Sequence, residues 1–157
     1  MISVIPKQFK QVNDLSVDVP DHVISTWNRY RQTECQTEAC GFIIGGYIPN
    51  SRTIVIDDCT TPGLMDIRRR TSYQLRDKKH SAAVLSAYHK TNGYSNFLGI
   101  WHTHPEPHPT PSNIDLSDWK RRMLENRTLI PAFIFAIIGT QTTSYFIYKN
   151  KRFTYEK

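Results

Sequence analysis

Two histidines separated by one residue stand in the middle of the chain, and their spacing suits metal binding. His102 and His104 lie at the end of an apolar run, residues 97–102, that predicts a short buried strand. Side chains on a strand alternate between its two faces, so both imidazoles point to the same side and can reach one ion. Paired histidines also occur as ordinary polar strand residues, so this spacing alone does not establish a metal site.

A serine and an aspartate follow within a few residues. Ser112 and Asp115 have the spacing of a capping box, in which the serine caps a helix and the aspartate occupies its third position. The loop bounded by Pro105 and Pro111 can turn back and bring the first helical turn beside the two histidines. Asp115 is then a candidate third ligand. Three nitrogen and oxygen ligands leave the fourth tetrahedral position of zinc for water, which is the arrangement of catalytic zinc sites.

The whole stretch reads His102-Thr-His-Pro, six further residues, and Ser112-Asn-Ile-Asp. It resembles the signature of the JAMM (MPN+) family of zinc metalloproteases and isopeptidases at every defined position. Upstream, Glu38-Ala-Cys-Gly-Phe-Ile-Ile-Gly resembles the family's glutamate, which leads into a hydrophobic strand containing glycine. The resemblance covers about residues 34–148 and is to bacterial stand-alone members, such as the deconjugating protease associated with CBASS antiphage systems.

The resemblance implies a role for each residue of the signature. One zinc ion per chain would be held by His102, His104 and Asp115 together with a metal-bound water. Glu38 would be the general base that takes a proton from this water and passes it to the leaving amine. Ser112 would hydrogen-bond the developing oxyanion. The implied fold is the cytidine-deaminase-like MPN/JAMM fold.

Family members hydrolyse isopeptide or peptide bonds that follow the C-terminal tail of ubiquitin or a ubiquitin-like protein. The resemblance therefore implies a deconjugase whose partner is a ubiquitin-like protein or a C-terminally conjugated protein. In a CBASS setting the conjugated protein would be a cyclic-nucleotide synthase, and processing of a sulfur carrier is the alternative. The family's substrate clamp corresponds to about residues 59–73, so the proposed substrate contacts are Arg68, Arg69, Arg70 and Tyr73.

Two readings from other classes remain open. A non-catalytic MPN-type interaction module is the fate of relatives that have lost metal ligands, and the intact signature argues against it. A basic nucleic-acid-binding domain is suggested by 20 Lys and Arg against 14 Asp and Glu, a net charge of +6. No recognised nucleic-acid motif accompanies this charge, so we expect no nucleic-acid partner.

Helical periodicity predicts three helices, at residues 19–32, 77–92 and 112–125. Strand-like runs interleave with them, at residues 40–48, 53–56, 97–102, 132–138, 144–148 and 153–155. A polar segment, residues 57–70, is too long for a tight turn and is expected to be a functional loop. The elements do not alternate regularly, so the prediction is a mixed α/β domain with a partly antiparallel sheet flanked by helices.

Side-chain placement on the helices is also predictable from spacing. The second helix is expected to bury Val84, Leu85 and Tyr88, and His80 is expected on its surface. The third helix draws its apolar positions from Ile114, Trp119, Met123 and Leu124. Asp118, three residues after Asp115, is expected to be exposed.

Length and composition fit one domain, residues 1–157, large enough to bury its own core. No apolar run approaches the roughly 18 residues that would span a bilayer, and residues 1–12 lack the apolar core of a signal peptide, so a cytoplasmic location without membrane contact is expected. The three cysteines, an odd number without C-x-x-C spacing, are expected to be reduced packing residues: Cys35, Cys40 and Cys59. The sequence does not predict an oligomeric state.

Overall fold

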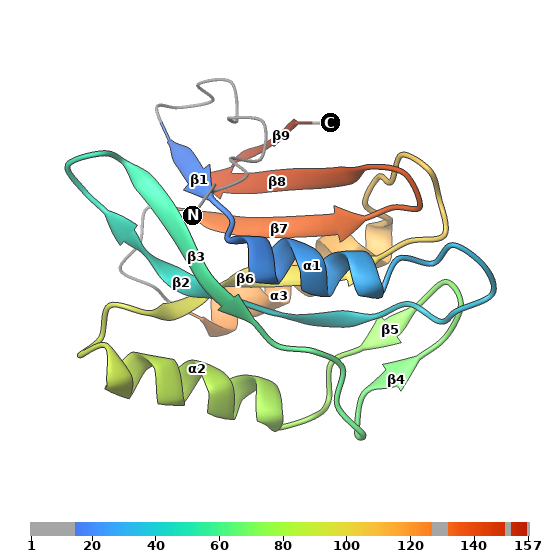
Figure 1. Cartoon of the computed structure of the whole chain (residues 1–157), viewed down its shortest axis with the longest axis horizontal. Coiled ribbons are helices and arrows are strands. Elements are labelled where there is room, and N and C mark those ends of the chain that lie inside the picture. The colour runs from blue at the N-terminus through green and yellow to red at the C-terminus, as the bar shows by residue number, and fades with distance from the viewer. Residues whose placement is uncertain (1–14, 127–131, 150–151, 157) are drawn as a thin grey trace.

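A curved seven-stranded sheet forms the frame of the computed structural model, which describes residues 15–126, 132–149 and 152–156 (Figure 1). Residues 1–12, which lack a signal-peptide pattern, lie outside this part. The strand order is β1-β3-β2-β6-β7-β8-β9. The strands are β1 Ser16–Asp18, β2 Cys40–Ile48, β3 Thr53–Cys59, β6 Asn96–Thr103, β7 Phe133–Ile138, β8 Thr143–Lys149 and β9 Arg152–Glu156.

Two strand pairs, β1 with β3 and β6 with β7, are parallel, and the other pairs of this sheet are antiparallel. This confirms the predicted mixed α/β class. A separate two-stranded ladder joins β4 Ile67–Arg68 to β5 Tyr73–Gln74. No helix in the described part of the chain is long and apolar enough to cross a membrane.

Three helices cover the two faces of the sheet. The helix α1, Asp21–Arg29, packs on one face, where Val23 and Trp27 enter the same apolar cluster as Ile43 and Ile54. The helices α2, Lys79–Lys90, and α3, Asn113–Glu125, pack on the other face (Figure 1). Burial on both faces explains why β2 and β6 read as nearly continuous apolar runs rather than alternating ones.

The helix α1 begins where the sequence predicts. Pro20 is its N-cap and has the extended backbone of that position, and Asp21 places an acid in the first turn. Val23 and Trp27, four residues apart, are both buried. The predicted helix at residues 19–32 is therefore confirmed with shorter ends.

The pairing of the central strands β2 and β6 fixes the position of His102 relative to the start of β2. Cys40 pairs with His102 across the antiparallel ladder. One residue further along, the N–H of Thr103 donates to the carbonyl of Ala39, and the N–H of Ala39 donates to the hydroxyl of Thr103. Close approach requires glycine at residue 41, because a Cβ there would collide with the carbonyl of Thr60. The start of β2 is therefore fixed against the end of β6.

The predicted buried face of α2 was wrong. Leu85 and Tyr88 are 58% and 43% exposed, whereas His80, expected on the surface, is 1% exposed. Val84 does pack into the core, and Gly93 has the positive φ expected just after the helix. The helix is rotated because His80 has polar partners inside the fold, which outweigh the burial of two apolar side chains.

Three smaller expectations also fail. Ile114 and Leu124 of α3 are 75% and 72% exposed, although Trp119 is buried as expected. Cys35 is exposed and therefore does not pack, while all three cysteines are free thiols as predicted. The strands β1, β4 and β5 were not predicted, because runs of two or three residues show no readable period.

Candidate metal centre

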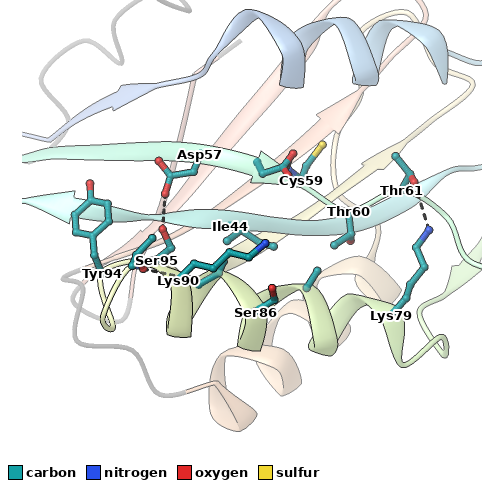
Figure 2. Close-up of a pocket in the computed structure, with 14 residues that line it drawn as sticks. Ile44, Asp57, Cys59, Thr60, Thr61, Lys79, Ser86, Lys90, Tyr94 and Ser95 are labelled. Carbon is teal, nitrogen blue, oxygen red and sulfur yellow. Dashed lines mark hydrogen bonds between the residues drawn. The ribbon is translucent and has the colours of Figure 1, made fainter.

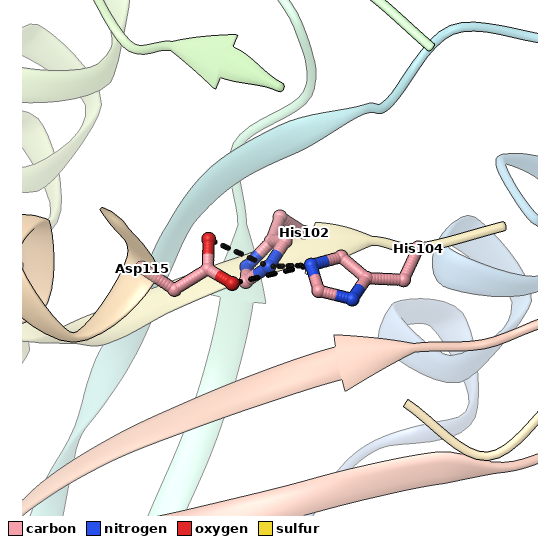
Figure 3. Close-up of side chains that lie close together, drawn as sticks. All are labelled: His102, His104 and Asp115. Carbon is pink, nitrogen blue, oxygen red and sulfur yellow. Dashed lines mark hydrogen bonds and ion pairs between the residues drawn. The ribbon is translucent and has the colours of Figure 1, made fainter. Parts of the chain in front are cut away.

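The end of β6 and the first turn of α3 bring three candidate ligands together (Figure 3). Nε2 of His102 lies 2.9 Å from Nε2 of His104. The carboxylate of Asp115 faces both rings, with Oδ1 3.3 Å from His102 Nε2 and Oδ2 3.2 Å from His104 Nε2. All three side chains are buried. The predicted ligand set is thus assembled with one donor atom from each residue at a common point.

The donor set fits a tetrahedral zinc ion. Ligand bonds of about 2.0–2.1 Å at tetrahedral angles separate donor atoms by about 3.3 Å. The nearest donor atoms of the three residues lie 2.9–3.3 Å apart, with His102 and His104 facing different oxygens of Asp115. Two Nε2 atoms that face each other can share only one proton between them, so a cation satisfies the pair better than a hydrogen bond does. Two imidazole nitrogens and a carboxylate oxygen are also ligands that zinc prefers.

The helix cap and the candidate ligand are the same carboxylate. Ser112 is the N-cap of α3, and its hydroxyl oxygen accepts from the N–H of Asp115 at 3.1 Å. The N–H of Ser112 in turn donates to Oδ2 of Asp115 at 2.7 Å. Capping and metal binding, which compete as interpretations of the sequence, are therefore compatible in the fold. The hydroxyl proton of Ser112 remains free to donate to another group.

The three candidate ligands shift one another's pKa values. Burial raises the pKa of Asp115, but hydrogen bonds with His102 and His104 hold that pKa well below its ordinary value. Burial lowers the pKa of His102. Burial also acts to lower the pKa of His104, yet Asp115 and Glu38 raise it overall. An ionised carboxylate and a neutral His102 are the forms in which these side chains bind a metal.

Glu38 lies beside the three candidate ligands. Its side chain is buried, and Oε1 is 3.9 Å from Nε2 of His104. Burial raises the pKa of Glu38 to about 8, and the neighbouring charge of His104 only partly offsets this. The backbone of Glu38 is held on both sides, because its N–H donates to the carbonyl of Arg69 at 2.8 Å and its carbonyl accepts from Nε of Arg68 at 2.7 Å. The carboxyl group can therefore take up and release a proton near neutral pH.

Comparison with known proteins agrees with this geometry. Residues 20–151 match the family described as prokaryotic homologs of the JAB domain. The chain belongs to this JAB family. A relative named CD-NTase/cGAS isopeptidase from Vibrio cholerae is 33% identical over 131 residues, 83% of each chain. Another of the same name from Escherichia coli is 34% identical over 118 residues, 74% of each chain. JAB is the domain on which the JAMM signature stands, so the resemblance seen in the sequence is confirmed.

A solved structure shares the fold of this JAB domain. It is the solution structure of protein DSY2949 from Desulfitobacterium hafniense, with a TM-score of 0.59 and 16% identity. The match covers 91% of this chain and 90% of that one. At this identity the likeness supports the fold alone, and it agrees with the predicted MPN/JAMM architecture.

The ladder of β4 and β5 places the proposed substrate contacts of the JAB domain at different depths. The ring of Tyr73 packs on the ring of His102, with centroids 4.7 Å apart. Arg68 is committed to the carbonyl of Glu38 and also lies over the ring of Tyr30, 5.9 Å from its centroid. The side chains of Arg69 and Arg70 are exposed at the turn of the ladder. Tyr73 therefore contacts a candidate ligand, Arg68 holds the backbone of Glu38, and the other two arginines lie further out, at the exposed turn.

A groove of about 430 Å³ opens beside the metal centre of the JAB domain. One wall is formed by residues 71–76, which include β5, and the other by the first turns of α3. Ser112 and Asp115 both line it, so the groove reaches the candidate ligands. Ile114, 75% exposed, adds an apolar side chain to the α3 wall.

A second groove, of about 770 Å³, lies between α2 and β3 (Figure 2). None of the three candidate ligands lines it. Polar groups on its walls bind each other: Ser95 donates to Asp57 at 2.5 Å, and Nζ of Lys79 lies 3.4 Å from the hydroxyl of Thr61. This groove therefore does not compete with the metal centre as the site of chemistry.

A buried hydrogen-bond chain supports the segment that carries β4 and β5, and the sequence did not reveal it. Nε2 of His80 lies 2.7 Å from Oδ2 of Asp66, and its Nδ1 lies 2.5 Å from the hydroxyl of Thr60. The Thr60 hydroxyl oxygen also accepts from the N–H of Phe42 in β2. Burial raises the pKa of Asp66, but backbone N–H groups and His80 hold it below its ordinary value. The only sequence signal was a histidine at the start of a helix, which is uninformative by itself.

Proposed function

We propose that this JAB domain is a zinc-dependent isopeptidase that hydrolyses the bond after the C-terminus of a conjugated protein. The observation that carries the proposal is the convergence of His102, His104 and Asp115 on one point beside the buried carboxyl of Glu38. Membership of the JAB family and the relatives named isopeptidases support it.

Zinc would be held by Nε2 of each histidine and by the carboxylate of Asp115. When bound, the ion supplies a Lewis acid that polarises the scissile carbonyl and lowers the pKa of water. A metal centre that reaches an open groove suits such a reaction, because a substrate can then approach the ion.

Glu38 and Ser112 would supply the remaining chemistry. Burial raises the pKa of Glu38 to about 8, close to neutral pH. Its carboxylate could therefore accept a proton from water and return that proton to a leaving amine. Ser112 already uses its hydroxyl oxygen as an acceptor, so its O–H can donate to the oxygen of the scissile carbonyl. Neither residue belongs to the proposed ligand set: Glu38 would move a proton between the water and the leaving amine, and Ser112 would contact the scissile carbonyl.

The substrate chain would enter along the groove beside β5. In its two-stranded ladder β5 pairs with β4 alone, so an extended tail can add to its other edge. Arg69 and Arg70 then lie where they can contact an acidic region of the conjugate. Tyr73 lines the groove and packs on His102, so its contact with substrate would be made from the groove wall.

The conjugated protein is proposed to be a cyclic-nucleotide synthase of the CD-NTase class in an antiphage CBASS system. The names of the relatives support this choice, because each names CD-NTase/cGAS as the protein on which the isopeptidase acts. They favour it over the processing of a sulfur carrier. Residues 1–157 are proposed to work as one domain in the cytoplasm, without a nucleic-acid partner.

The test uses a CD-NTase joined through its C-terminus to a lysine of a second protein. The zinc-loaded domain should release the CD-NTase with an intact C-terminal carboxylate, identified by intact mass. Glu38→Gln should bind zinc as the unmodified chain does and release product about 10²–10⁴-fold more slowly. Zinc-loaded, folded protein that leaves this conjugate and a ubiquitin-like conjugate uncut would contradict the proposal and favour a non-catalytic module.

A further inference from the structure

Three side chains near the candidate metal centre each bury a polar atom that has no hydrogen-bond partner among the described residues. These atoms are Nδ1 of His102, the hydroxyl of Tyr73 and Oδ2 of Asp118. Since Nε2 of His102 faces Asp115 and His104, Nδ1 lies on the opposite edge of the ring. A buried polar atom left without a partner is destabilising, so three such atoms in neighbouring side chains call for a common explanation.

The fold brings these side chains to one place. Tyr73 packs on the ring of His102, with centroids 4.7 Å apart. Asp118 follows Asp115 by three residues on α3, so the two carboxylates lie on the same side of the helix. Tyr73, Asp115 and Asp118 all line the groove beside the metal centre.

The charge of Asp118 acts on both neighbours. Burial is the main influence on the pKa of His102, which it lowers, and on that of Tyr73, which it raises. Asp118 raises the pKa of both groups, because its negative charge favours their protonated forms. A phenol that keeps its proton remains a hydrogen-bond donor.

The donors and acceptors in this cluster are complementary. A histidine that binds metal through Nε2 carries its proton on Nδ1 and needs an acceptor there. The phenol of Tyr73 can accept at its oxygen and donate its proton, and Oδ2 of Asp118 can only accept. The other oxygen of Asp118 is already used, because Oδ1 accepts from Nη2 of Arg121 at 2.6 Å. Oδ2 is therefore the acceptor that remains for this cluster.

We propose that Tyr73 and Asp118 are positioning residues for the metal ligand His102. The Nδ1–H of His102 and the phenol of Tyr73 both donate toward Oδ2 of Asp118 through one shared water, because no direct hydrogen bond joins the three atoms. The pair thereby fixes the tautomer and the orientation of the ring whose Nε2 faces the other ligands. The proposal rests on the zinc site of the proposed function and assigns Tyr73 a second role beyond substrate contact.

Zinc affinity of the full chain, measured by competition with a chelator, tests the proposal without a substrate. Asp118→Ala should weaken zinc binding about 10–100-fold, and Tyr73→Phe should weaken it by about tenfold. Asp118→Asn keeps an oxygen acceptor and should lose less than the alanine variant. The loss of zinc affinity in the double variant Tyr73→Phe/Asp118→Asn should be smaller than the product of the two single fold-losses, because the two groups act as one unit.

Glu125→Gln is the matched control, because Glu125 is the other carboxylate partner of Arg121 on the same helix. Its zinc affinity should stay within about twofold of the unmodified chain, as for loss of an exposed ion pair. The visible absorption of the cobalt-loaded protein gives a second readout, since the bands should change in the Tyr73 and Asp118 variants and not in the control. If the alanine variant does not fold, the nearly isosteric phenylalanine and asparagine variants decide the question.

Unchanged zinc affinity and cobalt bands in folded Tyr73→Phe and Asp118→Asn would overturn the positioning role and leave the zinc isopeptidase proposal intact. A folded unmodified chain that binds no zinc would overturn both. If the Asp118 variants lose only as much zinc affinity as Glu125→Gln does, Asp118 acts through Arg121 rather than through His102.

Discussion

Ser112 and Asp115 bind each other reciprocally at the start of α3. The N–H of Ser112 donates to Oδ2 of Asp115 at 2.7 Å, and the N–H of Asp115 donates to Oγ of Ser112 at 3.1 Å. The same Oδ2 lies 3.2 Å from Nε2 of His104. The helix cap therefore holds the carboxylate toward His104, so Asp115 would serve both the stability of the helix and the proposed metal binding.

Substitutions at Asp115 can separate these two roles. Asp115→Asn retains an oxygen that accepts from the N–H of Ser112, whereas Asp115→Ala does not. Both variants should lose most bound zinc. The alanine variant should also lose about 0.5–2 kcal/mol more of the free energy of unfolding than the asparagine variant, as measured by urea denaturation of metal-free protein. Full zinc occupancy in folded Asp115→Ala would show that Asp115 is not a ligand.

The stability of the metal-free protein should depend on pH through Glu38. Burial raises the pKa of this group from 4.5 to about 8, so between these values the folded state holds a proton that the unfolded state has released. The stabilising contribution of protonated Glu38 is fully present below about pH 4.5 and is lost as the pH rises through about 8. The unfolding free energy should therefore fall by a few kcal/mol over this window, relative to Glu38→Gln.

Urea denaturation at several pH values, in a chelator, checks this sign. His104 and Asp115 also titrate beside Glu38, so the informative quantity is the difference between the two proteins rather than either curve alone. A difference that stays flat from pH 4.5 to 8 would mean that the carboxyl of Glu38 is not buried in the metal-free protein.

His80 should be essential for the support of residues 60–78. His80→Ala leaves the buried carboxylate of Asp66 without its side-chain partner and opens a cavity beside Thr60. The free energy of unfolding should fall by about 2–4 kcal/mol. Amide exchange of residues 60–78 should also become faster, because the segment loses its buried hydrogen bonds. The segment carries Arg68 and Arg69, which hold the backbone of Glu38.

His89→Ala is the matched control for His80, because His89 is an exposed histidine on the same helix. Its unfolding free energy should change by less than about 0.5 kcal/mol. Equal effects of the two substitutions would show that the hydrogen bonds of His80 do not contribute to the stability of the fold.

Arg69 and Arg70 should contribute to substrate binding and not to the chemical step. Reversing both charges to Glu should raise KM for the conjugate by about tenfold or more and leave kcat nearly unchanged, because the two side chains are exposed at the turn of the ladder of β4 and β5. Lys90→Glu, in the separate groove between α2 and β3, is the control and should leave KM unchanged. An unchanged KM in the double reversal would exclude both arginines as substrate contacts.

Much of the site was determined by the sequence itself, because its geometry is local. His102 and His104 face the same side of a strand by simple alternation, and Ser112 and Asp115 form a cap by their spacing alone. The approximate limits of most of the longer strands and helices followed from the periods of their apolar residues and from proline and glycine at their ends, although β3 continues to Cys59, into the segment expected to be a loop. These features depend on neighbours within a few residues and are therefore readable without the fold.

Only the tertiary structure decided which faces are covered and which polar groups find partners. The helix α2 turns inward on His80 rather than on Leu85 and Tyr88, because Asp66 and Thr60 lie inside the fold to receive the histidine. Asp118 was expected at the surface, yet its side chain is only 20% exposed and its Oδ2 is buried. Such placements depend on contacts between residues far apart in the chain, and the period of a helix fixes the spacing of its side chains but not the surface they meet.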